Sequence, residues 1–384
     1  MQQVKELQDK VRLLESRQAQ PVPEPANSSS VENAEITSEP AAKVEPLHDL
    51  HGIQWRGFGE VDYKVLDQRQ PETSIFGFTP GSAGNFFIGD FDLYLTSKIG
   101  QRTSVLAEIV IGEQEHQTFD VDLERMLLKY DYNDHLRMSF GRYHTGISYY
   151  NTAFHSGRWL QTAVDRPLII EFAAEGGLLP TQGVGVSMTG LIPSGPLGLN
   201  YQFEYGSGDT IRPDIDGSGK EDDEENGNHV LLGLFARPLE IPGLQVGGSF
   251  YHDKISNHEA GENVRFGQTI LNAHVIYVAH GIESLNEGFL VRHAPENSST
   301  VFNTPAFYSQ LSKSFGHIRP YFRYQYVNAS AEGFYEDVLL RHGPSFGARY
   351  DLSDNVAFKV QLDHTLRKTK PDLNGLQMQL AFTF

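Results

Sequence analysis

The chain has 384 residues, carries a formal net charge of −18 and contains no cysteine, which excludes disulfides, thiolate metal sites and thiol nucleophiles. No run of 18 apolar residues is present, which argues against a helical membrane protein, and no clustered basic stretch favours nucleic acid as a partner. The mean hydropathy of −0.38, with 24 Phe and 17 Tyr, still fits a transmembrane β-barrel, because barrel strands are only half apolar.

The first part of the chain differs in composition from the rest. Residues 1–17 predict a short helix with apolar residues from Val4 to Leu14 at the a and d positions of two heptads. Two heptads are marginal alone, so a frayed helix and a small coiled coil held together by an oligomeric barrel both stay open. Residues 18–50 are rich in Pro, Ala, Ser and Glu and predict a flexible linker before a barrel domain at 51–384.

From residue 53 onward, the sequence alternates with period 2 in segments long enough to cross a bilayer at a tilt. The connections alternate between long and short, as in an up-and-down barrel with loops at one rim and turns at the other. With an even number of strands, both termini fall on the rim of the short turns. We therefore predict an all-β fold, a 16-stranded antiparallel transmembrane β-barrel, with strands at 53–65, 86–98, 103–113, 120–131, 136–143, 183–192, 197–206, 229–238, 243–253, 268–279, 286–294, 305–315, 318–328, 344–351, 356–367 and 375–384.

The alternation also assigns the two faces of each strand. In 53–65, for example, Glu60 and Asp62 oppose Val61 and Tyr63, and 197–206, 318–328 and 356–367 follow the same rule. A charge on the lipid face costs about 2–4 kcal/mol at the bilayer midplane, so the charged faces are expected to point inward. Sixteen strands with a polar inner wall predict a water-filled channel rather than a packed core.

The last ten residues form the clearest of these strands. Alternate residues from Leu376 to Phe384 are apolar, and those from Gly375 to Thr383 are polar or small. A terminal strand that ends on Phe resembles the closing strand of bacterial outer-membrane β-barrels, in which the last Phe is read by the insertion machinery. The resemblance implies a place in the bacterial outer membrane, among its lipids and lipopolysaccharide, with the N- and C-termini in the periplasm.

The longest connection, 144–182, is too rich in apolar residues for an exposed loop and is expected to fold into the barrel and narrow it. Opposed charges in a narrow pore create a transverse field that selects polar solutes. The alternative is that the same charges only fix the loop in place. The candidate constriction residues are Arg142, His144, His155, Arg158, Asp165 and Arg166 on or beside the loop, and Arg56, Asp62, Arg319, Arg323 and Lys359 on the wall.

A sixteen-stranded barrel with an in-folded third loop resembles the general and substrate-selective bacterial porins, and the heptads before the barrel resemble the phosphate-selective porin O and P group. The resemblance implies a homotrimer that lets small polar or charged solutes and ions diffuse passively. The dense array of Lys and Arg in the phosphate-selective group is not evident here, so the resemblance does not extend to phosphate selectivity. The alternative function is a non-conducting outer-membrane anchor or scaffold that links to the cell wall or to a periplasmic partner.

An acidic stretch, 214–225, matches the spacing D-x-D-x-S-G-x5-E of calcium-binding loops. Its flanks are predicted strands instead of helices, and the alternative is a solvated acidic loop bridged by divalent ions to lipopolysaccharide phosphates. The possible Ca²⁺ ligands are Asp214, Asp216, Ser218, Lys220, Asp222 and Glu225.

No catalytic motif stands out in the sequence. The 15 His are scattered, and no H-E-x-x-H, G-x-S-x-G or P-loop sequence occurs. We therefore expect no enzymatic activity and, apart from the possible Ca²⁺, no cofactor.

Overall fold

The structure is a computed structural model, and it describes residues 52–68, 84–114, 118–171, 177–208, 228–257, 264–332, 335, 338–368 and 370–384. The predicted N-terminal helix, the linker and the acidic stretch 214–225 lie outside the described residues. Within the described part of the chain, no helix is long and apolar enough to cross a membrane.

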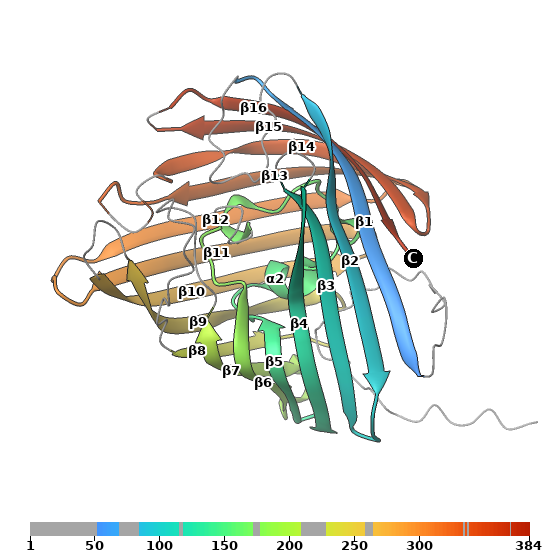
Figure 1. The fold of residues 1–384 in the computed structure, drawn as a ribbon, viewed down its shortest axis with the longest axis vertical. Helices are drawn as coiled ribbons and strands as arrows, with labels where there is room; N and C mark the ends of the chain where they lie inside the picture. Colours follow the sequence, from blue (N-terminus) through green and yellow to red (C-terminus); the bar gives the residue numbers. More distant parts are fainter. Residues whose placement is uncertain are drawn as a thin grey trace, which may run out of the picture. The chain divides into compact units, whose positions relative to one another are not determined.

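In the described part of the chain, sixteen strands form a closed barrel in which every strand pairs antiparallel with its neighbours in sequence and β1 pairs with β16 (Figure 1). The predicted fold class and the number of strands are therefore confirmed. The strands are β1 (Ile53–Leu66), β2 (Asn85–Lys98), β3 (Thr103–Gln114), β4 (Thr118–Asn133), β5 (Leu136–His144), β6 (Gln182–Ile192), β7 (Leu199–Gly208), β8 (Asn228–Ala236), β9 (Leu244–Asn257), β10 (Val264–Ala279), β11 (Ile282–Pro295), β12 (Phe302–Lys313), β13 (Ile318–Asn328), β14 (Leu340–Ser353), β15 (Val356–Arg367) and β16 (Leu373–Thr383).

The strand predicted from residue 197 begins two residues later than predicted, because the turn before it has its own local structure. It starts at Leu199 and follows a short 3-10 helix, η6 (Gly195–Leu197). Pro196 lacks the N–H that a ladder hydrogen bond needs. Gly198 then adopts a left-handed conformation with φ of 59°, which favours glycine, before the ladder with β8 begins.

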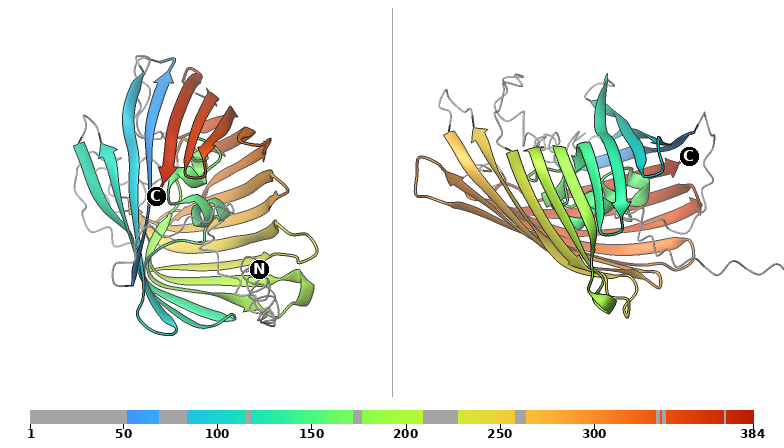
Figure 2. Two further views of the ribbon diagram at one scale, coloured as in Figure 1. Left: turned by 90° about the vertical axis from the view of Figure 1, so that its right-hand side faces the viewer. Right: turned by 90° about the horizontal axis from the view of Figure 1, so that it is seen from below.

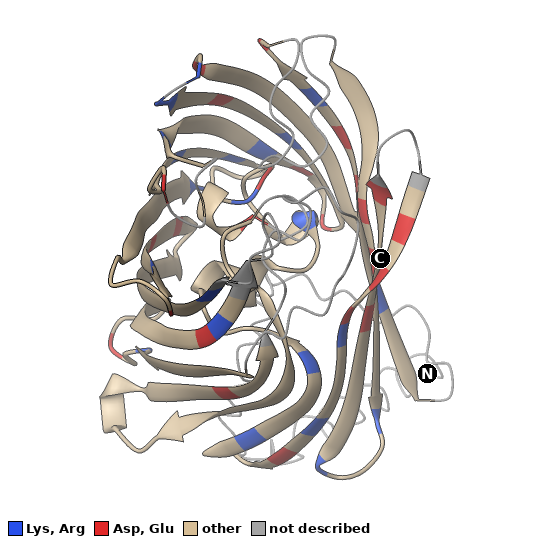
Figure 3. Ribbon diagram, turned by 60° about the vertical axis from the view of Figure 1, so that its left-hand side comes forward, with Lys and Arg blue, Asp and Glu red and all other residues tan. Residues whose placement is uncertain are grey.

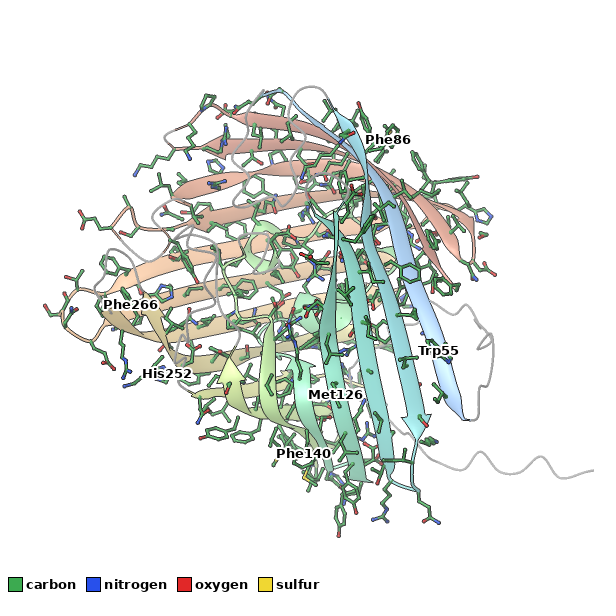
Figure 4. All side chains as sticks on the ribbon, in the orientation of Figure 1. Trp55, Phe86, Met126, Phe140, His252 and Phe266 are labelled. Carbon is green, nitrogen blue, oxygen red and sulfur yellow. The ribbon has the colours of Figure 1, made fainter. Side chains whose placement is uncertain are left out.

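The outer face of the barrel carries a band of exposed apolar side chains. Trp55, Phe86, Met126 and Phe140, labelled in Figure 4, are all exposed on β1, β2, β4 and β5. The alternation predicted for β1, β7, β13 and β15 is confirmed, since Glu60, for example, is buried while Val61 is exposed. A band of exposed apolar side chains of this extent is unusual for a protein surrounded by water and is what a lipid-facing wall requires.

The seam between the first and the last strand is closed by backbone and by aromatic rings. Phe384 N donates to Gly57 O at 3.0 Å, and Gly57 N donates to Phe384 O at 2.9 Å. The Phe384 ring lies over Gly57 so closely that a Cβ there would be 2.2 Å from the ring. It also stacks on Phe91 of β2, with centroids 5.7 Å apart. The strict alternation of the last strand thus ends in a contact that only glycine permits.

The inner wall has two different sectors. Charged positions occur on strands around the barrel (Figure 3), and many of the inward ones are buried, as are Glu60 and Asp62. Strands β8 to β13 also contribute buried apolar side chains, among them Leu231, Tyr251 and Ile270. The sequence predicted a polar wall without this apolar sector, because the faces were assigned from strands in which the charged residues stand out.

Candidate functional site: the loop inside the barrel

The connection between β5 and β6 lies inside the ring of strands (Figures 1 and 2). Its described residues include a helix, α2 (Tyr149–Phe154), and the 3-10 helices η3 (Arg158–Leu160) and η4 (Leu168–Ile170). We call its described parts, residues 145–171 and 177–181, the inner loop. Almost all of its side chains are buried, although it is a connection and not a strand.

One side of the inner loop packs on the apolar sector of the wall. Tyr150 makes an edge contact with Tyr308 of β12, with ring centroids 5.9 Å apart, and belongs to one buried cluster with Ile270 and Phe289. A buried aliphatic or aromatic side chain contributes about 1.5–3 kcal/mol relative to exposure. Burial of its apolar groups therefore accounts for much of the inward position of the loop. The loop members of the cluster are Ile147, Tyr149, Tyr150, Ala153, Phe154, Leu168, Ile169, Ile170, Leu178 and Leu179.

The start of α2 is held by a single carboxylate of the wall, Glu287 of β11. Tyr149 N and Tyr150 N each donate to Glu287 at 2.9 Å, and Ser148 Oγ donates to it at 3.0 Å. Tyr308 OH donates from the wall at 2.7 Å. A negative group at the N-terminus of a helix satisfies N–H groups that have no partner within the helix. Glu287 thus fixes both the position and the direction of α2.

The opposite side of the inner loop is held by cationic side chains of the wall. Lys359 Nζ of β15 donates to Arg158 O at 2.5 Å and to Ala163 O at 3.1 Å. Arg349 of β14 donates to Gln161 O at 3.1 Å and to Trp159 O. These cations supply hydrogen bonds to buried backbone carbonyls of the loop. These two cations fix the loop by contacts to its backbone.

Asp165 forms the second anionic contact of the site, this time from the loop to the wall. It pairs with Arg323 of β13, whose Nη1 also donates to Asp165 O at 2.9 Å. Gln361 and Gln377 donate to its carboxylate at 2.8 Å and 3.0 Å. Burial alone would raise the pKa of Asp165, but Arg323 and these hydrogen bonds bring the pKa below its ordinary value. A small cavity lies beside this carboxylate, bordered by Lys64, Gln325, Asp363 and Gln377.

A third group of polar contacts joins the inner loop to β4. His155, directly after α2, approaches Glu124 with Nε2 3.2 Å from Oε2, and its ring stacks on His144 with centroids 3.6 Å apart. The pKa of His155 is held well below its ordinary value, mainly by burial and secondly by the positive charge of Arg166. Arg166 donates to the backbone carbonyl of His155. This group lies at the end of the loop where it leaves β5.

The structure brings most of the predicted constriction residues together. Asp165 meets Arg323, and Arg158 meets Lys359 through its carbonyl oxygen. Asp62 accepts a hydrogen bond from Gln379, which also accepts one from Lys359.

Three of the predicted residues have other surroundings. Arg319 Nη1 is 3.3 Å from Thr162 Oγ1 and also 4.0 Å from Glu283 Oε2, so it faces both the loop and the wall. Arg142 pairs with Asp122 of β4 at 3.3 Å and donates to Gln182, and it is partly exposed. Arg56 lies on the same face of β1 as Phe58, whose ring stacks on Trp159 of the loop.

Sequence reasoning missed several residues that hold the loop. Glu287 and Arg349 make the contacts described above, and Gln361 accepts from Val164 N at 3.2 Å. The alternation of the predicted strands placed each of them on a definite face, but nothing in one sequence showed which loop atoms they would meet. Glu124 was missed for a different reason, since it is an extra residue at a β-bulge, where the β3–β4 register steps from Glu108↔Arg125 to Ile109↔Leu123.

The comparisons with known proteins concern the fold. No family model and no curated protein matches the chain. Among solved structures, an anion-selective porin from Comamonas acidovorans is similar at a TM-score of 0.57 and 12% identity, covering 86% of this chain and 99% of that one. OmpT of Vibrio cholerae with loop L8 deleted is similar at a TM-score of 0.56 and 11% identity, covering 86% of this chain and 99% of that one. OmpF of Salmonella typhi in a complex with daunomycin is similar at a TM-score of 0.52 and 14% identity, covering 86% of this chain and 97% of that one.

The chain has the porin fold. The similarity extends over nearly the full length of each neighbour, and it agrees with the closed sixteen-stranded barrel seen here. At such low identity the likeness concerns architecture alone. The predicted resemblance to the phosphate-selective group stays a prediction.

Proposed function

We propose that this protein is a porin of the bacterial outer membrane through which small polar or charged solutes and ions diffuse passively, and that the inner loop narrows its channel. The observation that carries the proposal is the position of the inner loop, held inside a closed barrel by Glu287, Arg349 and Lys359. A channel filter has to keep its position against thermal motion. Contacts with strands on opposite sides of the barrel hold the inner loop in its position. The apolar outer face fits a lipid environment.

The proposed constriction residues have two roles, fixing the loop and setting the electric field in the channel. Lys359 and Arg323 both contact the loop backbone, so we assign them to fixing the loop as well as to setting the field within the channel. Asp62 and Arg158 contribute opposite charges where the loop passes β1 and β16. The remaining proposed constriction residues, with the same two roles, are Arg56, Arg142, His144, His155, Asp165, Arg166 and Arg319.

Further parts of the proposal follow from the barrel as a whole. We infer a homotrimer, contacts with outer-membrane lipids and lipopolysaccharide, and termini in the periplasm. Thr383 N donates to Asn355 O in the short turn between β14 and β15, so the end of β16 lies on the rim of the short turns, which we propose faces the periplasm. We propose no enzymatic activity. Calcium binding by 214–225 remains part of the proposal.

A second function is favoured by one specific observation. The inner loop contacts side chains from strands all round the barrel and not from one side of it, which fits a plug as well as a filter. A plugged barrel would act as a non-conducting anchor that links the outer membrane to the cell wall or to a periplasmic partner. The contacting wall residues are Glu124 (β4), Glu204 (β7), Ser249 (β9), Glu287 (β11), Arg323 (β13), Arg349 (β14), Lys359 (β15) and Gln379 (β16).

Conductance in a planar lipid bilayer separates the two functions. The filtering porin predicts stepwise openings of the full chain, with ion selectivity measurable from the reversal potential across a salt gradient. Deleting 156–164 from the inner loop is expected to enlarge each step. The control is a deletion of equal length within 209–227, between β7 and β8, which is expected to leave the step size nearly unchanged. A full chain that never conducts, together with a 156–164 deletion that does, would overturn the porin and support the plugged anchor.

A further inference from the structure

A cluster of metal-ligating side chains lies where the inner loop leaves β5. Glu124 comes from the bulge in β4, His144 is the last residue of β5, and His155 follows α2. Their ligand atoms all lie within 4.8 Å of one another. Glu124 Oε2 is 3.2 Å from His155 Nε2 and 3.6 Å from His144 Nε2. Three separate segments of the chain thus converge on one point.

The hydrogen bonds around His155 fix which of its ring nitrogens carries the proton. Asn151 donates its amide hydrogens to Thr145 O and Thr181 O, at 2.9 Å and 2.8 Å, which orients its Oδ1 as an acceptor. His155 Nδ1 lies 2.8 Å from that Oδ1 and must therefore donate to it. The neutral ring then directs the lone pair of Nε2 at the carboxylate of Glu124. Two acceptors at 3.2 Å repel each other unless a cation or a proton lies between them.

His144 brings a second imidazole nitrogen to the same point. Its side chain is 5% exposed, and among the described residues its Nε2 has no hydrogen-bond partner. A buried polar atom without a partner destabilises the folded state. One proton shared between His155 and Glu124 would satisfy that pair and leave His144 Nε2 as it is. A metal ion would satisfy all three atoms.

We propose that Glu124, His144 and His155 bind a divalent transition-metal ion, with Zn²⁺ as its representative. Imidazole nitrogens with a carboxylate suit Zn²⁺, whereas Ca²⁺ and Mg²⁺ prefer oxygen ligands alone. A tetrahedral ion with bonds of about 2.0–2.2 Å holds its ligand atoms about 3.3–3.6 Å apart, which is close to the spacing seen here. Glu108 Oε2 lies 3.8 Å from His144 Nε2 but outside the group of three, so its side chain has to shift to serve as the fourth ligand.

The surroundings of the cluster resemble the supporting shell of a metal site. Asn151 fixes the orientation of His155, and Gln182 donates to Glu124. Such partners orient metal ligands and select the tautomer that binds. Arg125 pairs with Glu108, so binding a cation there requires Glu108 to share its charge between the two. The metal would tie β3, β4 and β5 to the inner loop, and this holds whether or not the barrel conducts.

Metal binding by the full chain, purified in detergent and freed of metal with a chelator, tests the proposal. Titration with Zn²⁺ followed by calorimetry is expected to show one tight site per chain. Co²⁺ in its place is expected to give the intense visible absorption of a four-coordinate site. The substitutions His144→Gln and His155→Gln should each weaken Zn²⁺ binding more than 100-fold, beyond the about 10–100-fold that loss of a supporting residue costs. His317→Gln, at an exposed turn, is the matched control and should leave the tight site intact.

The location of the ion is checked independently of any variant. A crystal of the full chain soaked with Zn²⁺ should show an anomalous peak at the zinc edge between Glu124, His144 and His155. No stoichiometric binding by the folded full chain would overturn the proposal, as would tight binding that survives both histidine substitutions. Neither readout uses conductance. A protein that binds zinc but never conducts would therefore contradict the porin function and still support the metal site.

Discussion

At the scale of single residues, Asp165 shows how the wall controls the loop. Its carboxylate meets Arg323, Gln361 and Gln377, and the charge of Arg323 with the hydrogen bond from Gln361 brings its pKa below the ordinary value. A depressed pKa means that the ionised group stabilises the folded arrangement at every pH above its unfolded value of about 3.9, and that this stabilisation is lost as the pH falls below it. We therefore expect the loop to keep its position between pH 7 and pH 5 and to loosen only in stronger acid.

Trp159 offers a direct measurement of that expectation. The sequence has two tryptophans, and Trp55 lies on the outer face while Trp159 packs between Phe58 and Arg349 inside. In a Trp55→Phe background, the emission of Trp159 should stay constant down to about pH 5 and shift to longer wavelength below about pH 4. Asp165→Asn, which cannot titrate, should remove most of that acid shift. A transition near pH 6 in both proteins would show that another group controls the loop.

Glu287 gives the second prediction at this scale. Glu287→Gln keeps the size of the side chain but replaces one acceptor oxygen by an amide that donates, opposite N–H groups that also donate. Loss of charged hydrogen bonds of this kind costs about 1–3 kcal/mol. Amide hydrogen exchange at Tyr149 and Tyr150 should therefore become about 5- to 150-fold faster, because the start of α2 opens more often. Glu240→Gln, in the exposed turn between β8 and β9, is the control and should leave both rates unchanged.

At the scale of elements, the sequence predicted the strands far better than the loop. Period-2 alternation in β1 or β16 is a property of one segment, so the strands and their faces can be derived locally. The contact of Asp165 with Arg323 joins residues far apart in the chain, and alternation says only that Arg323 points inward. The bulge at Glu124 breaks the very rule on which the face assignment depends. Such features become visible only once the register of two strands is known.

The closing seam leads to a prediction for a single pair of strands. A Cβ at Gly57 would meet the Phe384 ring at 2.2 Å, whereas one at Gly288 of β11 would meet nothing within 4 Å. Gly57→Val should therefore displace the ring and destabilise the barrel by about 1–3 kcal/mol, the usual cost of overpacking. Gly288→Val should be neutral or slightly stabilising, since valine favours strands. Unfolding by urea in lipid vesicles measures both, and equal stabilities would show that the seam tolerates a side chain at residue 57.

At the scale of the whole molecule, polarity is distributed by face. The outer wall carries a broad band of exposed apolar side chains, while the inner wall combines buried charges with the apolar sector under the inner loop. In a water-soluble protein, the apolar side chains would be inside and the charges outside. An apolar outer face is stable when lipid surrounds the barrel. A new charge should therefore destabilise the barrel most where the outer face contacts hydrocarbon.

Leu271 and Leu239 allow that dependence to be measured with one kind of substitution. Leu271 lies in the middle of β10, where it pairs with Phe250 and Leu290 on the outer face, and all three are exposed. Leu239 is more exposed still but lies in the turn after β8, away from the centre of any strand. Leu271→Arg should lower the free energy of unfolding in lipid vesicles by about 2–4 kcal/mol, and Leu239→Arg by about 0–1 kcal/mol. Equal losses at the two positions would mean that the middle of the outer face does not lie in hydrocarbon, and the membrane-spanning role would have to be given up.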